Sequence, residues 1–336
     1  CIEFEKIHID NIDVICVGWD IPFIIKERYL RNIVANNNSK FLEDKRDEMI
    51  RVLSIDENLK KIGFKGKVEY FNHYDCHTAY AFSTSKFKEA LYISLDGYGE
   101  DNSGKIGSIN TKRITDCINY PIKHSLGLLY AGITDFLGFK RLCDEGIVMG
   151  LAAHGDYKSK VKKLKFTYHD FFKKNIKLIN GNIIINENFF LLGLEKRGFF
   201  TDKFFKLFGK KRKFGEDISK HHQNIAAGFQ RRIEEIIYGL AKYLNNKYKL
   251  SNLILSGGLA LNCVSNGKIY KNKKIKKIHV PSAPGDNGVA IGAVILSIKK
   301  EIGLFVKIED NPYLGPAYKK INKREIQKIL SKNKFK

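Results

Sequence analysis

The chain of 336 residues lacks several features that would place it in a common class of proteins. It has no run of about 18 apolar residues, which a membrane-spanning helix requires, so we expect no membrane partner. No basic segment followed by a short apolar core occurs near its start, which argues against a secretory signal. Its six cysteines form no Cys-x-x-Cys pair, so neither a zinc ribbon nor a dithiol motif is expected. We therefore expect reduced thiols in a cytoplasmic protein.

Acidic residues are also scarce, and the resulting excess of positive charge has two interpretations. Lys and Arg number 59 against 36 Asp and Glu, a net charge of +23, which is typical of proteins that bind nucleic acid or another polyanion. The alternative is codon bias, because the chain is rich in Lys, Ile and Asn and has only 6 Pro, 2 Met and 1 Trp. We favour codon bias because no basic stripe interleaved with aromatic residues occurs, and we do not expect a nucleic-acid partner.

Hydrophobic periodicity predicts strands that alternate with helices, which is typical of an α/β fold. At 43% hydrophobic residues the chain can fill a substantial core. The segment 157–214 is weakly periodic and is interpreted as an insertion of short strands and helices. Strands are expected at 14–18, 68–71, 90–95, 106–110, 113–119, 253–255 and 278–280, and helices at 41–62, 73–82, 125–137, 145–153, 218–246, 285–302 and 325–336.

His73 and His77 have the spacing of two metal ligands on one face of a helix. The same spacing also occurs by chance between unrelated polar residues at a helix end, and the pair alone does not decide between the two. Asp286 is the best candidate for a third ligand because it lies in a glycine-flanked turn that opens a helix. An Asp at that position is also a good N-cap, and the two roles are compatible.

Two strand-to-turn junctions are candidates for phosphate binding. Asp96–Gly97 follows one strand, where Asp96 could orient a magnesium ion or a water, although an ordinary Asp-Gly turn is the simpler interpretation. Gly257–Gly258 follows another strand and precedes Asn262, although a tight turn with positive φ explains it equally. We expect these two glycine turns to form phosphate cradles in separate lobes and to face the same cleft. Lys140 lies in a glycine-rich helical block, where it could meet a phosphate or pair with Glu145.

Taken together and in order, these motifs resemble the ATP-dependent O-carbamoyltransferases, which include nodulation-factor and antibiotic-tailoring enzymes. The resemblance spans about Val14 to Tyr318. It rests on five segments, namely 72–79, 94–100, 125–155, 256–263 and 281–292. Five ordered matches are far more specific than any single one of them.

The resemblance implies an actin-like, two-lobed α/β catalytic domain, similar to the domain that transfers threonylcarbamoyl to tRNA. Carbamoyl phosphate and ATP would form carbamoyl-adenylate, and the carbamoyl group would pass to a hydroxyl of a sugar or another small molecule. A divalent metal, Fe²⁺ or Zn²⁺, would bind at His73, His77 and Asp286, and Mg²⁺ could accompany ATP. The nucleotide would contact Asp96, Gly97, Gly257, Gly258 and Asn262, and the candidate catalytic residues are Asp96 and Lys140.

The resemblance also implies domain boundaries and leaves two alternatives. The catalytic domain would cover 1–310, with lobe I at about 1–88 plus 285–302, lobe II at about 89–284 and a second, adenylate-forming domain beginning at 311–336. We expect the family's first phosphate turn to lie before Cys1, and we expect this chain alone not to make product from carbamoyl phosphate and ATP. The alternatives are a tRNA threonylcarbamoyladenosine-type transferase, which would use the positive charge, and a non-catalytic nucleotide-binding fragment. Oligomeric state is not predicted beyond the possibility of a homodimer.

Overall fold

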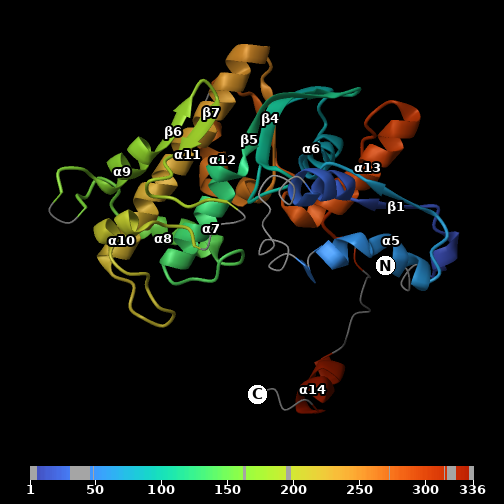
Figure 1. Cartoon of the computed structure of the whole chain (residues 1–336), viewed down its shortest axis with the longest axis horizontal. Coiled ribbons are helices and arrows are strands. Elements are labelled where there is room, and N and C mark those ends of the chain that lie inside the picture. Colours follow the sequence, from blue (N-terminus) through green and yellow to red (C-terminus); the bar gives the residue numbers. More distant parts are fainter. Residues whose placement is uncertain are drawn as a thin grey trace.

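The computed structural model describes residues 6–30, 46–47, 49–161, 164–193, 198–271, 273–313, 315 and 323–332. A mixed five-stranded sheet is its central element, with the strand order β5–β4–β3–β8–β9. Figure 1 labels its strands β4 and β5. β3 and β8 are parallel, as are β8 and β9, whereas β4 runs antiparallel to both β3 and β5. The strands are β3 (Glu89–Leu95), β4 (Asn102–Asn110), β5 (Ile114–Pro121), β8 (Asn252–Ser256) and β9 (Lys277–His279).

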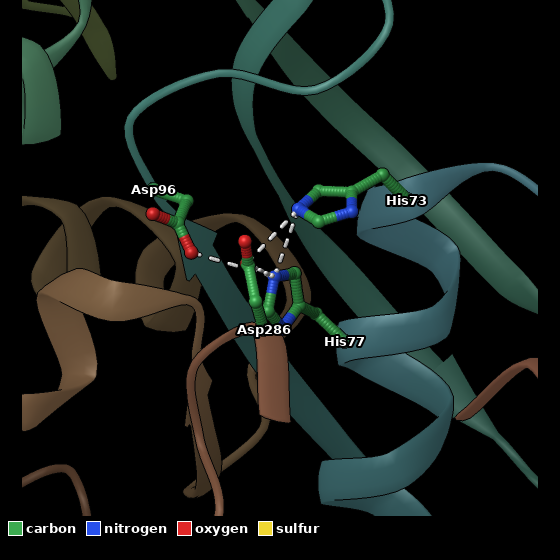
Figure 2. Close-up of side chains that lie close together, drawn as sticks. All are labelled: His73, His77, Asp96 and Asp286. Atoms are coloured by element: carbon green, nitrogen blue, oxygen red, sulfur yellow. Dashed lines mark hydrogen bonds and ion pairs between the residues drawn. The ribbon is translucent and has the colours of Figure 1, made fainter. Parts of the chain in front are cut away.

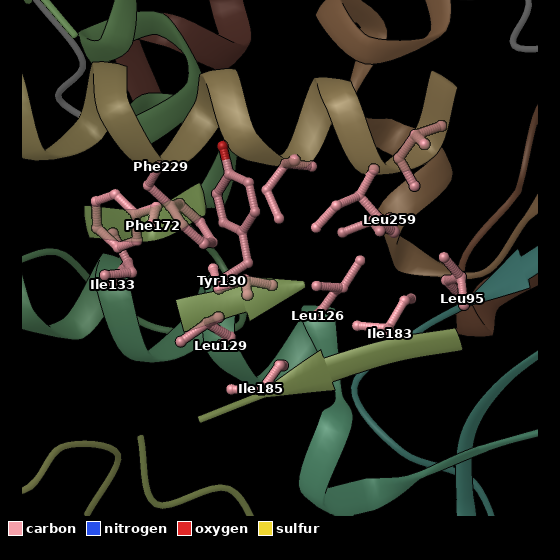
Figure 3. Packing of buried hydrophobic residues seen from close by; sticks show 14 of the residues in the cluster. Leu95, Leu126, Leu129, Tyr130, Ile133, Phe172, Ile183, Ile185, Phe229 and Leu259 are labelled. Carbon is pink, nitrogen blue, oxygen red and sulfur yellow. The ribbon is translucent and has the colours of Figure 1, made fainter. Parts of the chain in front are cut away.

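Helices cover both faces of this sheet, and β3 shows why. Successive side chains on a strand point to opposite faces. Ala90 and Tyr92 join a core with α6 (His73–Thr84) and α13 (Val289–Ile302). The intervening residues Leu91, Ile93 and Leu95 join the larger core with α7 (Leu126–Phe136) and α11 (Lys220–Tyr248), part of which Figure 3 shows. The structure is therefore a layered α/β fold.

Two small sheets flank the central one. β1 (Val14–Val17) pairs in parallel with β2 (Lys67–Tyr70) and lies against α13. The insertion contributes the antiparallel pair β6 (Ile176–Ile179) and β7 (Asn182–Ile185). The other helices and helical turns are η1 (Ile9–Asn11), α2 (Ile21–Phe23), η2 (Ile24–Leu30), α5 (Ile55–Lys61), η3 (Ile122–His124), α8 (Glu145–Leu151), η4 (Ala152–His154), α9 (Tyr168–Asn175), α10 (Asp202–Phe208), η5 (Gly258–Leu261), α12 (Cys263–Ile269), η6 (Asp286–Gly288) and α14 (Lys323–Lys332).

The expected strands are confirmed with small shifts of their ends, and so are the helices that carry the candidate ligands. Of the helix expected at 41–62, residues 46–47, 49–53 and 55–61 are helical, whereas residues 41–45 and 48 lie outside the described residues. Residues 314, 316–322 and 333–336 of the expected second domain also lie outside them. None of the described helices combines the length and apolarity that spanning a bilayer demands.

One expectation about the fold is wrong: the two glycine turns are not in separate lobes. β3 ends before Asp96–Gly97 and β8 ends before Gly257–Gly258, and these two strands are parallel neighbours in a single sheet. The carboxyl ends of parallel strands lie at the same edge, so the two turns meet there. More than 150 residues separate them in the chain, which is why local sequence patterns did not reveal the pairing.

Close backbone contact between α6 and α13 generates a first prediction. A Cβ atom added at Gly292 would lie 2.0 Å from the carbonyl oxygen of Cys76 on α6. Gly292→Val should therefore lower the free energy of unfolding by about 1–3 kcal/mol or more, as overpacked cores do. Ala290→Val, at an exposed position of α13, is the control. Urea denaturation of both variants measures the difference, and equal stabilities would contradict the packing described here.

Glu69 on β2 generates a second prediction. Its carboxylate accepts hydrogen bonds from Ser297 (2.7 Å) and Lys300 (3.1 Å) on α13 and pairs with Lys67 (3.0 Å). These partners, Ser297 foremost, lower the pKa of Glu69 to about 2. A depressed folded-state pKa stabilises the fold above the unfolded value of about 4.5, and this stabilisation is lost as the pH falls toward 2.

Glu69→Gln should therefore lower the free energy of unfolding by about 1–3 kcal/mol at pH 7, with the difference from the unsubstituted chain shrinking between pH 5 and pH 2. Denaturant titrations at several pH values measure this difference. A difference that stays constant down to pH 2 would show that the carboxylate charge is not the cause.

Candidate metal centre

Two buried imidazoles on the first turns of α6 form the core of the site. Asn72 begins the helix by accepting the backbone N–H of Asp75 (3.3 Å). His73 and His77 follow with side chains that are about 1% exposed. One helical turn separates them, so both rings lie on the same face. Their Nε2 atoms are 3.1 Å apart, which means that the two nitrogen lone pairs can be directed at one point.

Two carboxylates complete the cluster (Figure 2). Asp286 Oδ1 lies 3.4 Å from His73 Nε2 and 3.5 Å from His77 Nε2, and Asp96 Oδ2 lies 3.4 Å from His77 Nε2. All four donor atoms lie within 4.8 Å of one another. The structure thus brings the three predicted ligands together. It also adds Asp96, which sequence reasoning had placed at the nucleotide.

Asp286 opens η6 without acting as a helix cap. Gly285 precedes this turn, Gly288 precedes α13, and neither helical start receives a side-chain cap. The alternative role of Asp286 as an N-cap is therefore not the one that the structure shows. Its side chain is 70% exposed, in contrast to the buried imidazoles. The cluster consequently has one solvent-facing side.

The donor set fits a divalent transition metal. The two neutral imidazoles and the Asp286 carboxylate form a nitrogen–oxygen set of the kind that suits Zn²⁺ and Fe²⁺, and Asp96 adds a second negative charge beside them. Ligands about 2.0–2.1 Å from a tetrahedral ion stand about 3.3–3.4 Å apart, close to the separations found here. The side chains would need only small movements to close on such an ion.

The orientation of His73 is fixed from the side opposite the cluster. Its Nδ1 lies 3.2 Å from the carbonyl oxygen of Gly18, which can only accept a hydrogen bond, so Nδ1 carries the proton. Nε2 is then unprotonated and directed toward the cluster. The ring of Trp19 packs on His73 with a centroid separation of 4.6 Å. A backbone acceptor of this kind is the usual partner of a metal-binding imidazole.

Electrostatics in the cluster couple proton binding to metal binding. Burial of His77 lowers its pKa, but Asp286 and Asp96 outweigh this effect, and the net pKa is raised. The imidazoles that face Asp286, His73 first and then His77, lower the pKa of its carboxyl well below the ordinary range. Without a metal, the two carboxylates therefore favour a proton on His77. A metal ion would have to displace that proton.

Sequence reasoning missed Glu100, which holds the ligand-bearing segments together. This residue is 1% exposed. Its carboxylate accepts the backbone N–H groups of His73 (2.8 Å) and Asp20 (2.9 Å) and the side-chain amide of Asn72 (2.9 Å). It therefore joins the start of α6 to the segment after β1. The only signal in the sequence is its place at the end of the 94–100 motif, which gives no hint of these partners.

A cavity of about 550 Å³ adjoins the cluster. Asp96 and Asp286 lie on its wall together with Gly97 and Gly258. Most of the remaining wall is apolar, and Tyr130, Met149, Leu259 and Leu261 belong to it. The cavity therefore combines a carboxylate-rich end with an apolar body, which is typical of sites for small organic ligands.

The glycine turns shape this edge of the sheet, but their N–H groups do not form the expected phosphate cradle. The N–H groups of Gly97 (2.6 Å) and Gly258 (2.7 Å) both donate to the carboxylate of Asp96, and Gly257 donates to the carbonyl of Pro284 (2.7 Å). Gly257 has a φ of +80°, and an added Cβ would lie 2.2 Å from the Leu95 carbonyl oxygen. Gly257 is therefore required for the turn, and the backbone N–H groups of Gly97 and Gly258 orient Asp96.

Asn262 lies on the same cavity wall as Asp96, Gly97 and Gly258, where the sequence placed it, whereas Lys140 lies elsewhere. Asn262 lines the cavity, but its side-chain amide exchanges two hydrogen bonds with Gln230 (2.9 and 3.0 Å). Lys140 does not line this cavity and belongs to a second one, beside Arg212 and Phe214. The possible partner of Lys140, Glu145, instead accepts the backbone N–H of Leu142 (2.7 Å).

Comparisons with known proteins agree on one family. The model described as carbamoyltransferase N-terminus matches residues 4–295. Nodulation protein NolNO of Sinorhizobium fredii is 25% identical over 94% of this chain and 43% of its own length. Nodulation protein NolO of Bradyrhizobium diazoefficiens is 28% identical over 73% of this chain and 41% of its own length. The chain spans less than half the length of the curated relatives that it matches.

Among solved structures, the chain is similar to full-length HypF in its phosphate- and nucleotide-bound form. That similarity has 12% sequence identity and a TM-score of 0.41, and it covers 78% of this chain and 50% of HypF.

Metal analysis tests the cluster directly. We expect the chain, dialysed against Zn²⁺ or Fe²⁺, to retain about one ion. His77→Ala should lose nearly all of it because one of two nitrogen ligands is removed. His154→Ala, at an exposed position away from the cluster, is the matched control and should bind normally. If His77→Ala and His154→Ala retain equal amounts of metal, the ion binds elsewhere.

Proposed function

This chain belongs to the carbamoyltransferase family, and from that premise we propose that it transfers a carbamoyl group from carbamoyl-adenylate to a hydroxyl of a sugar or another small molecule. The adenylate would be made from carbamoyl phosphate and ATP. The observation that carries the proposal is the cluster of His73, His77, Asp96 and Asp286 at the wall of an apolar cavity. Membership of the family supports the type of reaction, and the cluster is the site at which we propose that it takes place.

The cluster gives each of its residues a role in this reaction. His73, His77 and Asp286 would hold the divalent metal, with the tautomer of His73 set by Gly18. A divalent ion held there supplies an electrophile that polarises the carbamoyl carbonyl or binds the adenylate phosphate. Asp286 is exposed on one side, so the bound group could be approached from the cavity.

Asp96 is suited to orienting the acceptor. Two backbone N–H groups fix its carboxylate at the cavity wall, which removes the cost of ordering it during the reaction. The acceptor oxygen would attack the carbamoyl carbon, the bond from that carbon to the adenylate oxygen would break, and AMP would leave. The hydroxyl proton would pass to Asp96, acting as a general base.

The apolar body of the cavity suits the nucleotide part of the donor. Tyr130, Met149 and Leu259 offer surface for a base or ribose, while the carboxylate-rich end would face the phosphate through a metal. The binding set that we propose is Asp96, Gly97, Gly258 and Asn262, all on the cavity wall, with Gly257 shaping the turn behind them. Asn262 would contribute shape, since Gln230 already occupies its amide.

The finer organisation is part of the same proposal. We infer an actin-like, two-lobed domain over residues 1–310 and the start of an adenylate-forming domain at 311–336. The order of the five sequence motifs supports this inference. Fe²⁺ or Zn²⁺ is the proposed resident metal.

A transfer assay that starts from preformed carbamoyl-adenylate tests the proposal without relying on adenylate formation. We expect the metal-loaded 336-residue chain to carbamoylate at least one member of a panel of sugars. Asp96→Asn should slow transfer about 10²–10⁴-fold because the general base is lost. Asp101→Asn, on the same loop but exposed, is the matched control and should retain the rate.

Carbamoylated product is measured by mass spectrometry, and metal content is measured in the same samples. The absence of product with every acceptor would contradict the proposed activity. Equal rates for Asp96→Asn and Asp101→Asn would contradict the role of Asp96.

A further inference from the structure

A second cavity, of about 600 Å³, lies beside the loop that follows α10. Four cationic residues and two aromatic ones line it, and among the described residues no Asp or Glu belongs to its lining. We refer to it as the basic cavity, and its charged and aromatic lining residues are Phe139, Lys140, Lys211, Arg212, Lys213 and Phe214. Such a concentration of one charge in a concave surface favours an anionic ligand.

Arg212 is held in the wall of the basic cavity by hydrogen bonds to backbone carbonyls. It is 5% exposed, and its backbone N–H donates to the carbonyl of Phe136 (3.0 Å) at the end of α7. Its guanidinium donates to the carbonyls of Leu137 (2.5 Å) and Gly138 (3.2 Å) and to that of Glu216. The guanidinium also lies over the ring of Phe139, 4.8 Å from its centroid. Arg212 therefore caps α7 and fixes the loop against it, so its own charge is largely committed to the fold.

The other three cations of the basic cavity are lysines, and only one of them has a charged partner that the structure describes. Lys211 forms an ion pair with Asp135 (2.6 Å). The ammonium groups of Lys140 and Lys213, by contrast, have no hydrogen-bond or ion-pair partner within the described part of the chain. Lys140 lies four residues after the end of α7, and Lys213 follows Arg212 directly in the chain. Both are exposed and free to close on an anion.

Phe214 adds an apolar surface beside these charges. Its side chain is 93% exposed, an unusual state for a phenylalanine, and it follows Lys213 directly. An exposed ring next to unpaired ammonium groups suits a ligand that combines a phosphate with a sugar ring or a planar group.

The basic cavity is also close to the proposed reaction site. Lys140 lines the basic cavity, whereas Leu142 lines the cavity beside the metal centre. Two residues span at most about 7 Å. A ligand whose phosphate binds at Lys140 could therefore extend toward the cavity beside the metal centre.

We propose that the basic cavity binds the phosphate group of a phosphorylated sugar or of a lipid headgroup, with Lys140 and Lys213 as its charge partners and Phe214 against the organic part. If the proposed transfer reaction holds, this ligand is the acceptor, but the binding itself does not depend on that reaction. The proposal also accounts for Lys140, which sequence reasoning marked as functional and which lies away from the metal centre.

Equilibrium binding to the 336-residue chain tests the proposal, with glucose 6-phosphate and inorganic phosphate as probes and glucose as the uncharged control. We expect saturable binding of both phosphates and none of glucose. The double variant Lys140→Ala/Lys213→Ala should weaken binding at least tenfold. The double variant Lys203→Ala/Lys206→Ala removes the same charge from exposed positions of α10 and should change affinity less than twofold. Phe214→Ala should weaken the binding of glucose 6-phosphate severalfold and leave the binding of inorganic phosphate unchanged.

Lysine acetylation read by mass spectrometry locates the ligand. Glucose 6-phosphate should protect Lys140 and Lys213 and leave Lys203 and Lys206 reactive. Vesicles of phosphatidylcholine with and without phosphatidylglycerol form the second arm. Protection only by the anionic vesicles would retain the phosphate site and identify its source as a lipid. No protection by either probe, or equal binding by the two double variants, would overturn the proposal. Metal content, measured in parallel, is independent of both results.

Discussion

The structure depends on one electrostatic constraint, the close approach of four donor groups at the edge of a buried sheet. The Nε2 atoms of His73 and His77 are 3.1 Å apart, Asp286 Oδ1 lies within 3.5 Å of both, and Asp96 Oδ2 lies 3.4 Å from that of His77. In the absence of a cation, two carboxylates would repel each other across two imidazoles that both offer lone pairs. A proton on His77 would relieve part of this repulsion, and a divalent ion would balance both carboxylate charges. The cluster is therefore better matched to a bound cation than to its own packing.

Much of the surrounding fold holds these groups in place. Glu100 ties the start of α6 to the segment after β1, and Gly18 in that segment fixes the tautomer of His73. On the opposite side of α6, Lys105 of β4 pairs with Asp75 (2.8 Å), so a partly buried ion pair anchors the helix to the sheet. Neither Glu100 nor the Lys105–Asp75 pair lines the cavity beside the metal centre. Both act on the metal centre only through the position of α6, which is how second-layer contacts usually influence metal ligands.

Sequence patterns predicted those parts of the site that local chemistry determines. The spacing of His73 and His77 follows from helix geometry alone, and the glycine-flanked turn singled out Asp286. The approach of Asp96 depends on the pairing of β3 with β8, a contact between distant segments that periodicity does not reveal. The same pairing explains why the glycine N–H groups serve Asp96 instead of a phosphate. The sequence did not predict the place of Lys140 for a similar reason, because the distant loop anchored by Arg212 forms the cavity that Lys140 lines.

X-ray absorption spectroscopy on the metal-loaded chain tests the central claim most directly, because it reports the atoms bound to the ion. We predict a first shell of nitrogen and oxygen atoms only, at about 2.0–2.2 Å, with outer-shell scattering from two imidazole rings. A first shell that contains sulfur, or one without scattering from two imidazoles, would contradict the assignment of His73 and His77 as ligands and with it the account of the site.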